Sequence, residues 1–360
     1  GTTITLTATT LGDVTSNTKI NLSFSGTATS GTDYSISQTY ITIPSGSNTA
    51  TQTFTITDDS VYEGDETIIF SSSIITGDST YTSESASINF TITENESAPT
   101  VTLTSSASSV AENGSALTLT ATLSGATDEE VTVGISTSGT GTEGTDYGTI
   151  SDITISAGST TGTTSFTPTD DSNYEGSETG IIAIDTVSGG SATENGTQSV
   201  TITITDDESA PTVTLTSSAS SIAENSGSSL TLTATLSGAT NANVTVALST
   251  SGTGTEGTDY GTVSDITITA GSTTGTVSFT PTDDSVYEGN ETGIIAIDTV
   301  SGGGATENGT QSVTLTITDN ESAPTVTLTS SASSIAENAG TSLTLTATLS
   351  GATNANVIVA

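Results

Sequence analysis

The sequence predicts an all-β protein, built from tandem immunoglobulin-like antiparallel β-sandwiches. Three observations lead to this prediction: a long internal repeat, regular alternation of apolar and hydroxyl residues, and the lack of any segment with the pattern of an amphipathic helix. The chain has 360 residues, enough for several ordinary domains. Only 31% of the residues are apolar. Threonine is abundant, however, and its β-branched side chain suits the outer face of a strand.

The internal repeat has a period of about 112 residues. The phrase Ser-Ala-Pro-Thr-Val-Thr-Leu-Thr-Ser begins at Ser97, Ser209 and Ser322. Such a period is too long for a solenoid unit and fits an independent sandwich domain. We expect the chain to be a segment of a longer periodic protein, with partial repeats at both ends. The expected repeats are residues 1–98, 99–210, 211–323 and 324–360.

Each repeat is expected to hold about seven strands, the number found in an immunoglobulin-like sandwich. In the second repeat, apolar residues alternate with Thr and Ser at a period of two, while Gly, Ser, Asn and Asp separate the runs. The expected strands carry Val101 and Leu103; Leu117, Leu119, Ala121 and Leu123; Val131, Val133 and Ile135; Ile153 and Ile155; Phe166; Ile182 and Ile184; and Val200, Ile202 and Ile204.

The charge of the chain excludes several classes of function. Lys19 is the only basic residue against 40 Asp and Glu, which gives a formal net charge of −39. Nucleic-acid binding is excluded because it needs cations to neutralise phosphates, and an anionic membrane surface would repel the chain. No apolar run is long enough to insert into a bilayer. Cysteine is absent, so disulfides and thiolate metal sites are excluded too.

The carboxylates recur in register at the ends of the expected strands, and they are our candidate metal ligands. Asp-Asp pairs at strand ends repel each other, and the chain lacks the Lys and Arg that could neutralise them. Ca²⁺ takes six to eight oxygen ligands, which carboxylates from separate loops can provide. The alternative is that these residues are solvated turn residues, because Asp favours turns. The candidates are Asp33, Asp58, Asp59, Glu63, Glu94 and Glu96 in the first repeat; Glu112, Asp146, Asp170, Asp171, Glu175, Asp206 and Asp207 in the second; Glu224, Asp259, Asp283, Asp284, Glu288 and Asp319 in the third; and Glu337 in the fourth.

These motifs resemble the Calx-β domain, known from sodium–calcium exchangers, an integrin β subunit and large bacterial surface proteins. The resemblance is carried by the run GTEGTDYGTISDITISAGSTTGTTSFTPTDDSNYEGSET and by the closing SVTITITDDE, and it extends over nearly the whole chain. It implies a seven-stranded sandwich whose loop carboxylates hold Ca²⁺ at one end. The family's closing run is often three Asp, whereas the three runs here are Asp-Asp-Glu, Asp-Asn-Glu and Glu-Asn-Glu. The ligands that it implies in the second repeat are Glu112, Asp146, Asp170, Asp171, Glu175, Asp206 and Asp207.

The expected function is structural and adhesive. The resemblance points to giant bacterial surface adhesins, including appendages used in attachment or gliding, in which repeats form an extracellular stalk or filament. Bound Ca²⁺ would stiffen the domain ends and junctions, helped by a short linker in which Pro211 fixes the backbone. The expected partners are the neighbouring repeats and lateral copies in a fibre. Contact with a host, a surface or a glycan would belong to a distal region outside this segment.

Other readings remain open. The repeats could form a Ca²⁺-sensing or ligand-binding module of a larger surface protein, or part of a phage or virus fibre. An enzyme such as a glycosidase would use paired carboxylates, but His, Cys, Arg and Trp are absent and the acids recur in every repeat. We therefore predict no catalytic residue. We expect packing roles, rather than sugar stacking, for Tyr147, Tyr174, Tyr260 and Tyr287.

Overall fold

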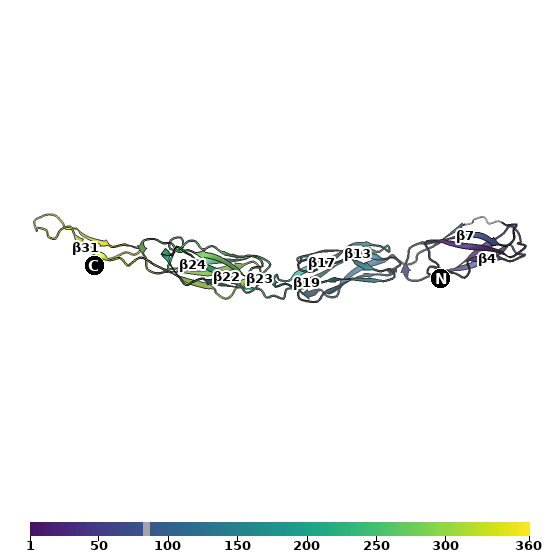
Figure 1. Cartoon of the computed structure of the whole chain (residues 1–360), viewed down its shortest axis with the longest axis horizontal. Helices are drawn as coiled ribbons and strands as arrows, with labels where there is room; N and C mark the ends of the chain where they lie inside the picture. The colour runs from purple at the N-terminus through teal and green to yellow at the C-terminus, as the bar shows by residue number, and fades with distance from the viewer. Residues whose placement is uncertain (82–86) are drawn as a thin grey trace. The chain divides into compact units, whose positions relative to one another are not determined.

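The structure is a computed structural model that describes residues 1–81 and 87–360, and it confirms the all-β fold (Figure 1). Among the described residues, strands account for the regular structure apart from a single 3₁₀ turn, η1 (Glu224–Ser226). No helix of this described part is long and apolar enough to cross a membrane. The chain divides into two compact units. One consists of residues 1–110, 114–168 and 179–203, and the other of residues 111–113, 169–178 and 204–360.

The first repeat contains two sheets. One has the order β1-β5-β3, with β1 (Thr3–Thr9), β5 (Thr49–Ile56) and β3 (Tyr34–Ile36). The other has the order β4-β2-β7-β8, with β4 (Tyr40–Ile43), β2 (Thr18–Gly26), β7 (Glu66–Thr76) and β8 (Ser87–Ile92). The two-residue strand β6 (Val61–Tyr62) lies outside both sheets.

The second repeat adds a strand to each sheet. The first sheet has the order β15-β11-β9-β18, with β15 (Thr161–Phe166), β11 (Leu117–Leu123), β9 (Thr100–Ser105) and β18 (Thr193–Glu194). The second has the order β10-β19-β17-β13-β14, with β10 (Ser109–Ala111), β19 (Ser199–Thr205), β17 (Glu178–Ser188), β13 (Val131–Gly139) and β14 (Ile153–Ile155). The short strands β12 (Ala126–Thr127) and β16 (Asn173–Tyr174) belong to neither.

The third repeat has the same two sheets. Their orders are β26-β22-β20-β29 and β21-β30-β28-β24-β25. The strands of the first are β26 (Thr274–Phe279), β22 (Leu230–Leu236), β20 (Thr212–Ser217) and β29 (Thr306–Glu307). Those of the second are β21 (Ser221–Ala223), β30 (Ser312–Thr318), β28 (Glu291–Ser301), β24 (Val244–Gly252) and β25 (Ile266–Ile268). The short strands are β23 (Ala239–Thr240) and β27 (Val286–Tyr287). After them come a hairpin of β31 (Val326–Ser330) and β32 (Leu345–Leu349), and then β33 (Ala352–Thr353).

The period-two pattern is confirmed as the division between core and surface. In β11, for example, Leu119, Ala121 and Leu123 are buried, whereas the threonines between them are partly or fully exposed. All seven strands expected in the second repeat are present. The sequence reasoning missed β10, β12, β16 and β18, because strands of two or three residues carry no detectable period.

An aromatic pair fills the core of each complete repeat. Tyr147 stacks on Phe166 with ring centroids 4.8 Å apart, and Tyr260 pairs with Phe279 at 4.7 Å. Both tyrosines are 1% exposed, so the predicted packing role holds for these two. The ring of Phe166 needs Gly180 beneath it, since a Cβ at that position would lie 2.8 Å from Cε2 of the ring.

Strand pairing brings the acidic segments together at strand ends. In the third repeat β21 runs parallel to β30, with Ala223 opposite Thr318, so the next residues, Glu224 and Asp319, leave the sheet side by side. In the same sheet Glu291 begins β28 opposite Ile317. The first repeat pairs Glu66 with Ile92 in the same way, just before the closing acidic run. The register of the sheet therefore positions carboxylates that are far apart in the sequence.

Candidate metal centre

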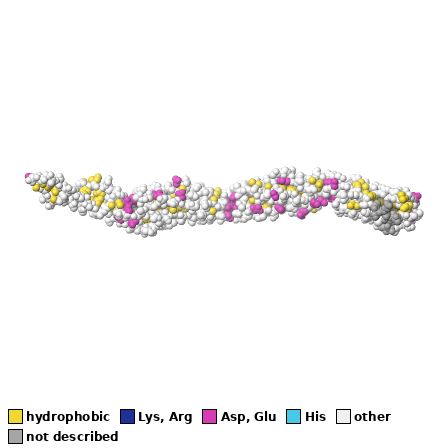
Figure 2. Space-filling view, turned by 90° about the horizontal axis from the view of Figure 1, so that it is seen from above, with side chains coloured by type: hydrophobic (Ala, Val, Ile, Leu, Met, Phe, Trp, Pro, Cys, Tyr) yellow, Lys and Arg dark blue, Asp and Glu magenta, His cyan; other side chains and the backbone are white. Residues whose placement is uncertain are grey.

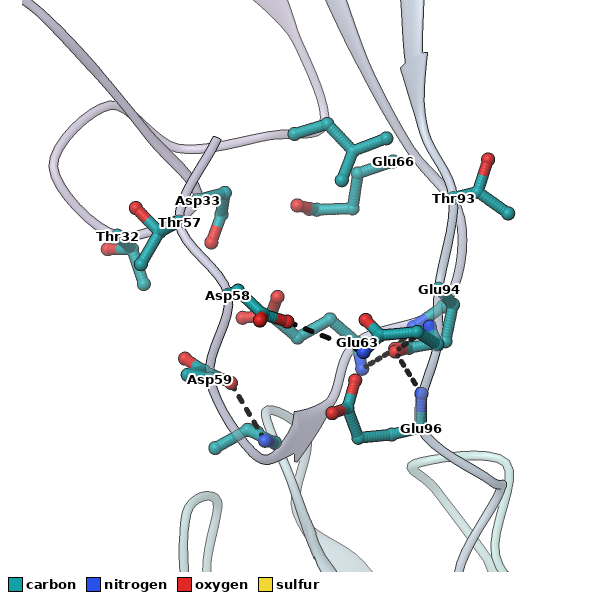
Figure 3. A pocket seen from close by; sticks show the side chains of 14 residues that line it. Thr32, Asp33, Thr57, Asp58, Asp59, Glu63, Glu66, Thr93, Glu94 and Glu96 are labelled. Atoms are coloured by element: carbon teal, nitrogen blue, oxygen red, sulfur yellow. Dashed lines mark hydrogen bonds between the residues drawn. The ribbon is translucent and has the colours of Figure 1, made fainter. Parts of the chain in front are cut away.

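Carboxylates of the first repeat surround a cavity of about 30 Å³, close to the volume of one water molecule or ion. Its lining includes Asp33, Glu66 and Glu94. Figure 3 shows Asp33 and Glu66 facing each other across this space, with Asp58 and Glu63 beside them. Asp33 is only 7% exposed and accepts the backbone N–H of Thr29 at 2.5 Å. The predicted ligands Asp58, Asp59, Glu63, Glu94 and Glu96 also line the cavity.

Glu94 organises the loop that follows β6. Its Oε2 accepts the N–H groups of Glu63 at 2.5 Å and Gly64 at 2.8 Å, and its Oε1 accepts that of Glu96 at 2.9 Å. Burial opposes ionisation of Glu94, but these donors outweigh it and lower its pKa to about 2. Glu94 is therefore an ionised group that already bonds its neighbours. It holds the loop in shape beside the cavity.

The other acids of this cavity repel one another. Burial, followed by the charge of Asp33, raises the pKa of both Glu63 and Glu66 to about 7. Glu66 Oε2 is buried and accepts no hydrogen bond. A buried carboxylate oxygen without a donor is costly unless a cation or a proton neutralises it.

In the second repeat, Glu112 has a buried carboxylate. It is 5% exposed, its Oε1 is buried, and no hydrogen bond satisfies that atom. Burial, followed by the facing carboxylate of Glu208, raises the pKa of Glu112 to about 8. Carboxylate oxygens of Glu112, Asp206 and Glu208 lie within 4.8 Å of one another, as do those of Glu112, Asp170 and Asp207.

Three other acids of the second repeat accept backbone N–H groups. Asp206 takes the place of Glu94: its Oδ2 accepts the N–H of Glu175 at 2.6 Å and also that of Gly176. Asp171 accepts the N–H of Asn173 at 2.6 Å. Asp146 lies in the turn before Tyr147 and accepts the N–H of Thr142 at 2.6 Å. The second oxygen of two of these carboxylates is also bonded: Oδ1 of Asp206 accepts the N–H of Glu208 at 2.9 Å, and Oδ2 of Asp171 accepts the side-chain amide of Asn173 at 3.1 Å.

The third repeat reproduces the arrangement. Glu224 is 7% exposed, and its carboxylate oxygen lies within 4.8 Å of those of Asp319 and Glu321. Burial and then Glu321 raise the pKa of Glu224 to about 7. Burial and then Asp259 raise the pKa of Glu291 to about 7, and the same two causes raise that of Glu288. Asp283 and Asp284 are exposed in the loop after β26.

Sequence reasoning missed several candidate ligands: the Glu that begins a long strand in each of the first three repeats, and Glu208 and Glu321 of the closing acidic runs. Glu66, Glu178 and Glu291 begin β7, β17 and β28, and Glu66 and Glu291 face the predicted acids. The signal was present, because Tyr-Glu-Gly is followed in each repeat by one residue and then Glu-Thr. Asp128, from the following repeat, was missed as well; its charge contributes to the raised pKa values of Glu63 and Glu66. Glu337 is exposed in a turn, unlike its buried equivalents Glu112 and Glu224.

The donor set fits a hard divalent cation. Every candidate ligand is a carboxylate oxygen, and the chain offers no His, Cys or Arg. On the face drawn in Figure 2, the Asp and Glu side chains gather in groups rather than spreading evenly. Several carboxylates within 4.8 Å suit the large, flexible coordination shell of Ca²⁺ better than the six-coordinate shell of Mg²⁺.

Comparison with known proteins gives one family. The Calx-beta domain matches residues 1–92, 94–208 and 206–321. A search of curated proteins found no match.

Similar solved structures include calcium-binding and adhesin domains. "Crystal structure of CBD12 from CALX1.2" is 20% identical, with a TM-score of 0.27, and the match covers 56% of this chain and 80% of that one. The bacterial integrin-binding protein invasin is 14% identical with a TM-score of 0.27, over 91% of this chain and 62% of that one. The adhesin InvE of Yersinia pseudotuberculosis is 15% identical with a TM-score of 0.27, over 61% and 59%. The family match, rather than these structural likenesses, carries the assignment.

Proposed function

Because this chain belongs to the Calx-β domain family, we propose that it is a structural and adhesive repeat region of an extracellular surface filament or stalk. Its repeats bind Ca²⁺ at their acidic ends, and the bound ions stiffen the array. The observation that carries the metal site is the buried, unsatisfied Oε1 of Glu112 within 4.8 Å of further carboxylates. A cation removes the cost of that arrangement, and the one basic side chain of the sequence, Lys19, lies in the first repeat over the ring of Tyr40.

The ion is held by residues from several loops. In the third repeat, Glu224, Asp319 and Glu321 lie at the end of one sheet, while Asp259 and Glu291 approach from other segments. Ca²⁺ supplies the positive charge that cancels their repulsion and joins the loops. The backbone N–H groups of Glu288 and Gly289, which donate to Asp319, keep that carboxylate oriented toward the site.

The near identity of the repeats favours a structural role. The second and third repeats share the same sheets, the same aromatic pair and equivalent acids, so neither is specialised for a ligand of its own. We place the protein outside the cell, at the surface, where Ca²⁺ is abundant, with a bacterial source. Its partners are the neighbouring repeats and lateral copies of the chain. Recognition of a host, a surface or a glycan belongs to a distal region.

Three other functions compete with this proposal. A Ca²⁺-sensing or ligand-binding module would need a connected effector, and a phage or virus fibre would use the same repeats on a different particle. We do not propose an enzyme, because the carboxylates form repeated ligand sets rather than one acid–base pair. Turnover of a glycan or ester that is lost in Asp171→Asn would contradict this.

Calorimetric titration of the chain with Ca²⁺ and with Mg²⁺ tests the metal site. We expect tighter binding of Ca²⁺ and a higher melting temperature in Ca²⁺ than in chelator, because an ion that binds only the native state stabilises it. Glu112→Gln should remove one site. Asp185→Asn, which removes the same charge from an exposed position of β17, should leave all sites intact. Equal melting in chelator and in millimolar Ca²⁺ would refute the proposal.

Small-angle scattering tests the stiffening. The chain should show a narrower distribution of sizes in Ca²⁺ than in chelator, and the double variant Asp206→Asn, Asp207→Asn should reduce this difference. Identical scattering in both conditions, with binding confirmed by calorimetry, would mean that the ion stabilises single repeats without stiffening the array.

A further inference from the structure

The two-residue strand that carries the Tyr of Tyr-Glu-Gly does not pair within its own repeat. It pairs in parallel with the Ala-Thr strand of the following repeat. The pairings are β6 with β12, β16 with β23 and β27 with β33. Beyond each pair, one more N–H continues the contact: Asp128 donates to the carbonyl of Tyr62 at 3.3 Å, Asn241 to that of Tyr174 at 3.4 Å, and Asn354 to that of Tyr287 at 3.4 Å. The same backbone contact therefore occurs at three successive junctions.

The ring of Tyr174 also contacts a loop of the following repeat. Gly304 lies in the Ser-Gly-Gly-Gly loop after β28, and a Cβ placed on it would lie 2.5 Å from Cε1 of Tyr174. The neighbouring Gly303 approaches Thr240 in the same way, with a Cβ position 2.6 Å from Oγ1 of that residue. Thr240 is itself 1% exposed. The loop thus covers the Ala-Thr strand and contacts the ring that pairs with it.

The equivalent loop of the second repeat also has a positive φ at a position that is not glycine. Its equivalent of Gly304 is Ser191, which has a φ of 51°, and among the described residues it is the one non-glycine with a positive φ. Such a conformation costs energy for a residue with a Cβ, and it persists where the surroundings require it. The residue before it, Gly190, approaches the buried Thr127 of β12, with a Cβ position 2.5 Å from Cγ2.

We propose that Tyr62, Tyr174 and Tyr287 connect successive repeats of the array, each at a contact that we call a joint. The backbone at each tyrosine pairs with the Ala-Thr strand of the next repeat, and the ring of Tyr174 also contacts the Ser-Gly-Gly-Gly loop at Gly304. The joint is an interface between successive repeats of one chain, and its contacts are made by backbone groups and a tyrosine ring rather than by carboxylates. The loop that carries Tyr174 belongs to the same compact unit as the third repeat, which fits this role. The joint acts in addition to the Pro211 linker and the ion, which we expect to stiffen the array.

The joint is linked to the metal site through one loop. The residues after Tyr174 are Glu175 and Gly176, whose N–H groups both donate to Asp206. The two bonds hold the loop that carries Tyr174 beside the acids of the second repeat.

The test uses the full chain with two spin labels. The chain has no cysteine, so Thr161→Cys in β15 and Thr274→Cys in β26 place labels on exposed positions of the second and third repeats. In chelator, Tyr174→Ala should widen the label–label distance distribution at least about twofold, because the ring contact between the repeats is lost. Tyr174→Phe should leave it unchanged. Amide exchange at Asn241 should become roughly tenfold faster in the alanine variant only.

A matched glycine pair separates the joint from general strain. Gly304→Leu and Gly309→Leu both introduce a side chain at a positive φ, but only the first meets Tyr174, since nothing lies within 4 Å of a Cβ at Gly309. Only Gly304→Leu should widen the distribution. One result would overturn the proposal: Tyr174→Ala and Gly304→Leu both leaving the width unchanged in chelator. That result would leave the metal proposal standing, because calorimetry and melting test Ca²⁺ binding separately.

Discussion

Replacing Glu112 by Gln should raise the free energy of unfolding of the second repeat in chelator and lower it in Ca²⁺. Burial and the facing Glu208 raise the pKa of Glu112 to about 8, so the folded protein binds a proton there that the unfolded chain releases near pH 4.3. The stability that this proton supports is complete below about pH 4.3 and is lost as the pH rises through 8. Above pH 8 without metal, the ionised Glu112 therefore opposes folding.

The size of the effect follows from the shift. One pKa unit corresponds to 1.36 kcal/mol, so the full shift sets an upper limit of about 5 kcal/mol, which solvent screening near the repeat end reduces to roughly 2 kcal/mol. At pH 8.5 in chelator, Glu112→Gln should thus stabilise the second repeat by about 2 kcal/mol. At a Ca²⁺ concentration 100 times the Kd, the wild type gains about 2.7 kcal/mol, and the variant should lose most of that gain.

Hydrogen exchange of core strands β17 and β19 is the suitable assay, because global unfolding of a multidomain chain is not a single two-state transition. In chelator the variant should exchange about 30-fold more slowly than the wild type, and in Ca²⁺ it should exchange faster. Asp185→Asn should change neither. A variant that exchanges faster in chelator and keeps the full response to Ca²⁺ would show that Glu112 is a satisfied structural residue.

Three further predictions concern the other repeats and the core. In chelator, the stability of the first repeat should fall between about pH 4.3 and pH 7, since folding raises the pKa values of Glu63 and Glu66 to about 7; exchange protection that rises over this range would contradict it. Asp128→Asn should weaken Ca²⁺ binding at the first junction several-fold and Asn241→Asp should strengthen it at the second, as measured by calorimetry; affinities unchanged from the wild type in both variants would mean that the following repeat supplies no ligand. Phe166→Ala should cost about 3–5 kcal/mol in the second repeat, because the ring is fully buried against Tyr147, and exchange of β11 measures the loss.

The local pattern determined the strands and most of the candidate ligands. A period of two places Leu119 and Ile202 in the core whichever strand they pair with, because alternate side chains of a strand point to opposite faces. The repeats gave Asp33, Asp146 and Asp259 the same position before a tyrosine. These features depend on neighbours within a few residues, and a single sequence contains them.

Strand pairing decided what the local pattern could not. Glu224 and Asp319 meet because β21 and β30 run parallel, and no local signal records which strand lies beside which. Burial likewise separated Glu112 from Glu337, which occupy the same position in their repeats. The tyrosines divided in the same way: Tyr147 entered the core of its own repeat, whereas Tyr174 paired with the next one. The sequence determines which side chains can bind a cation or fill a core, but only the register of the folded sheets brings their atoms within reach of one another.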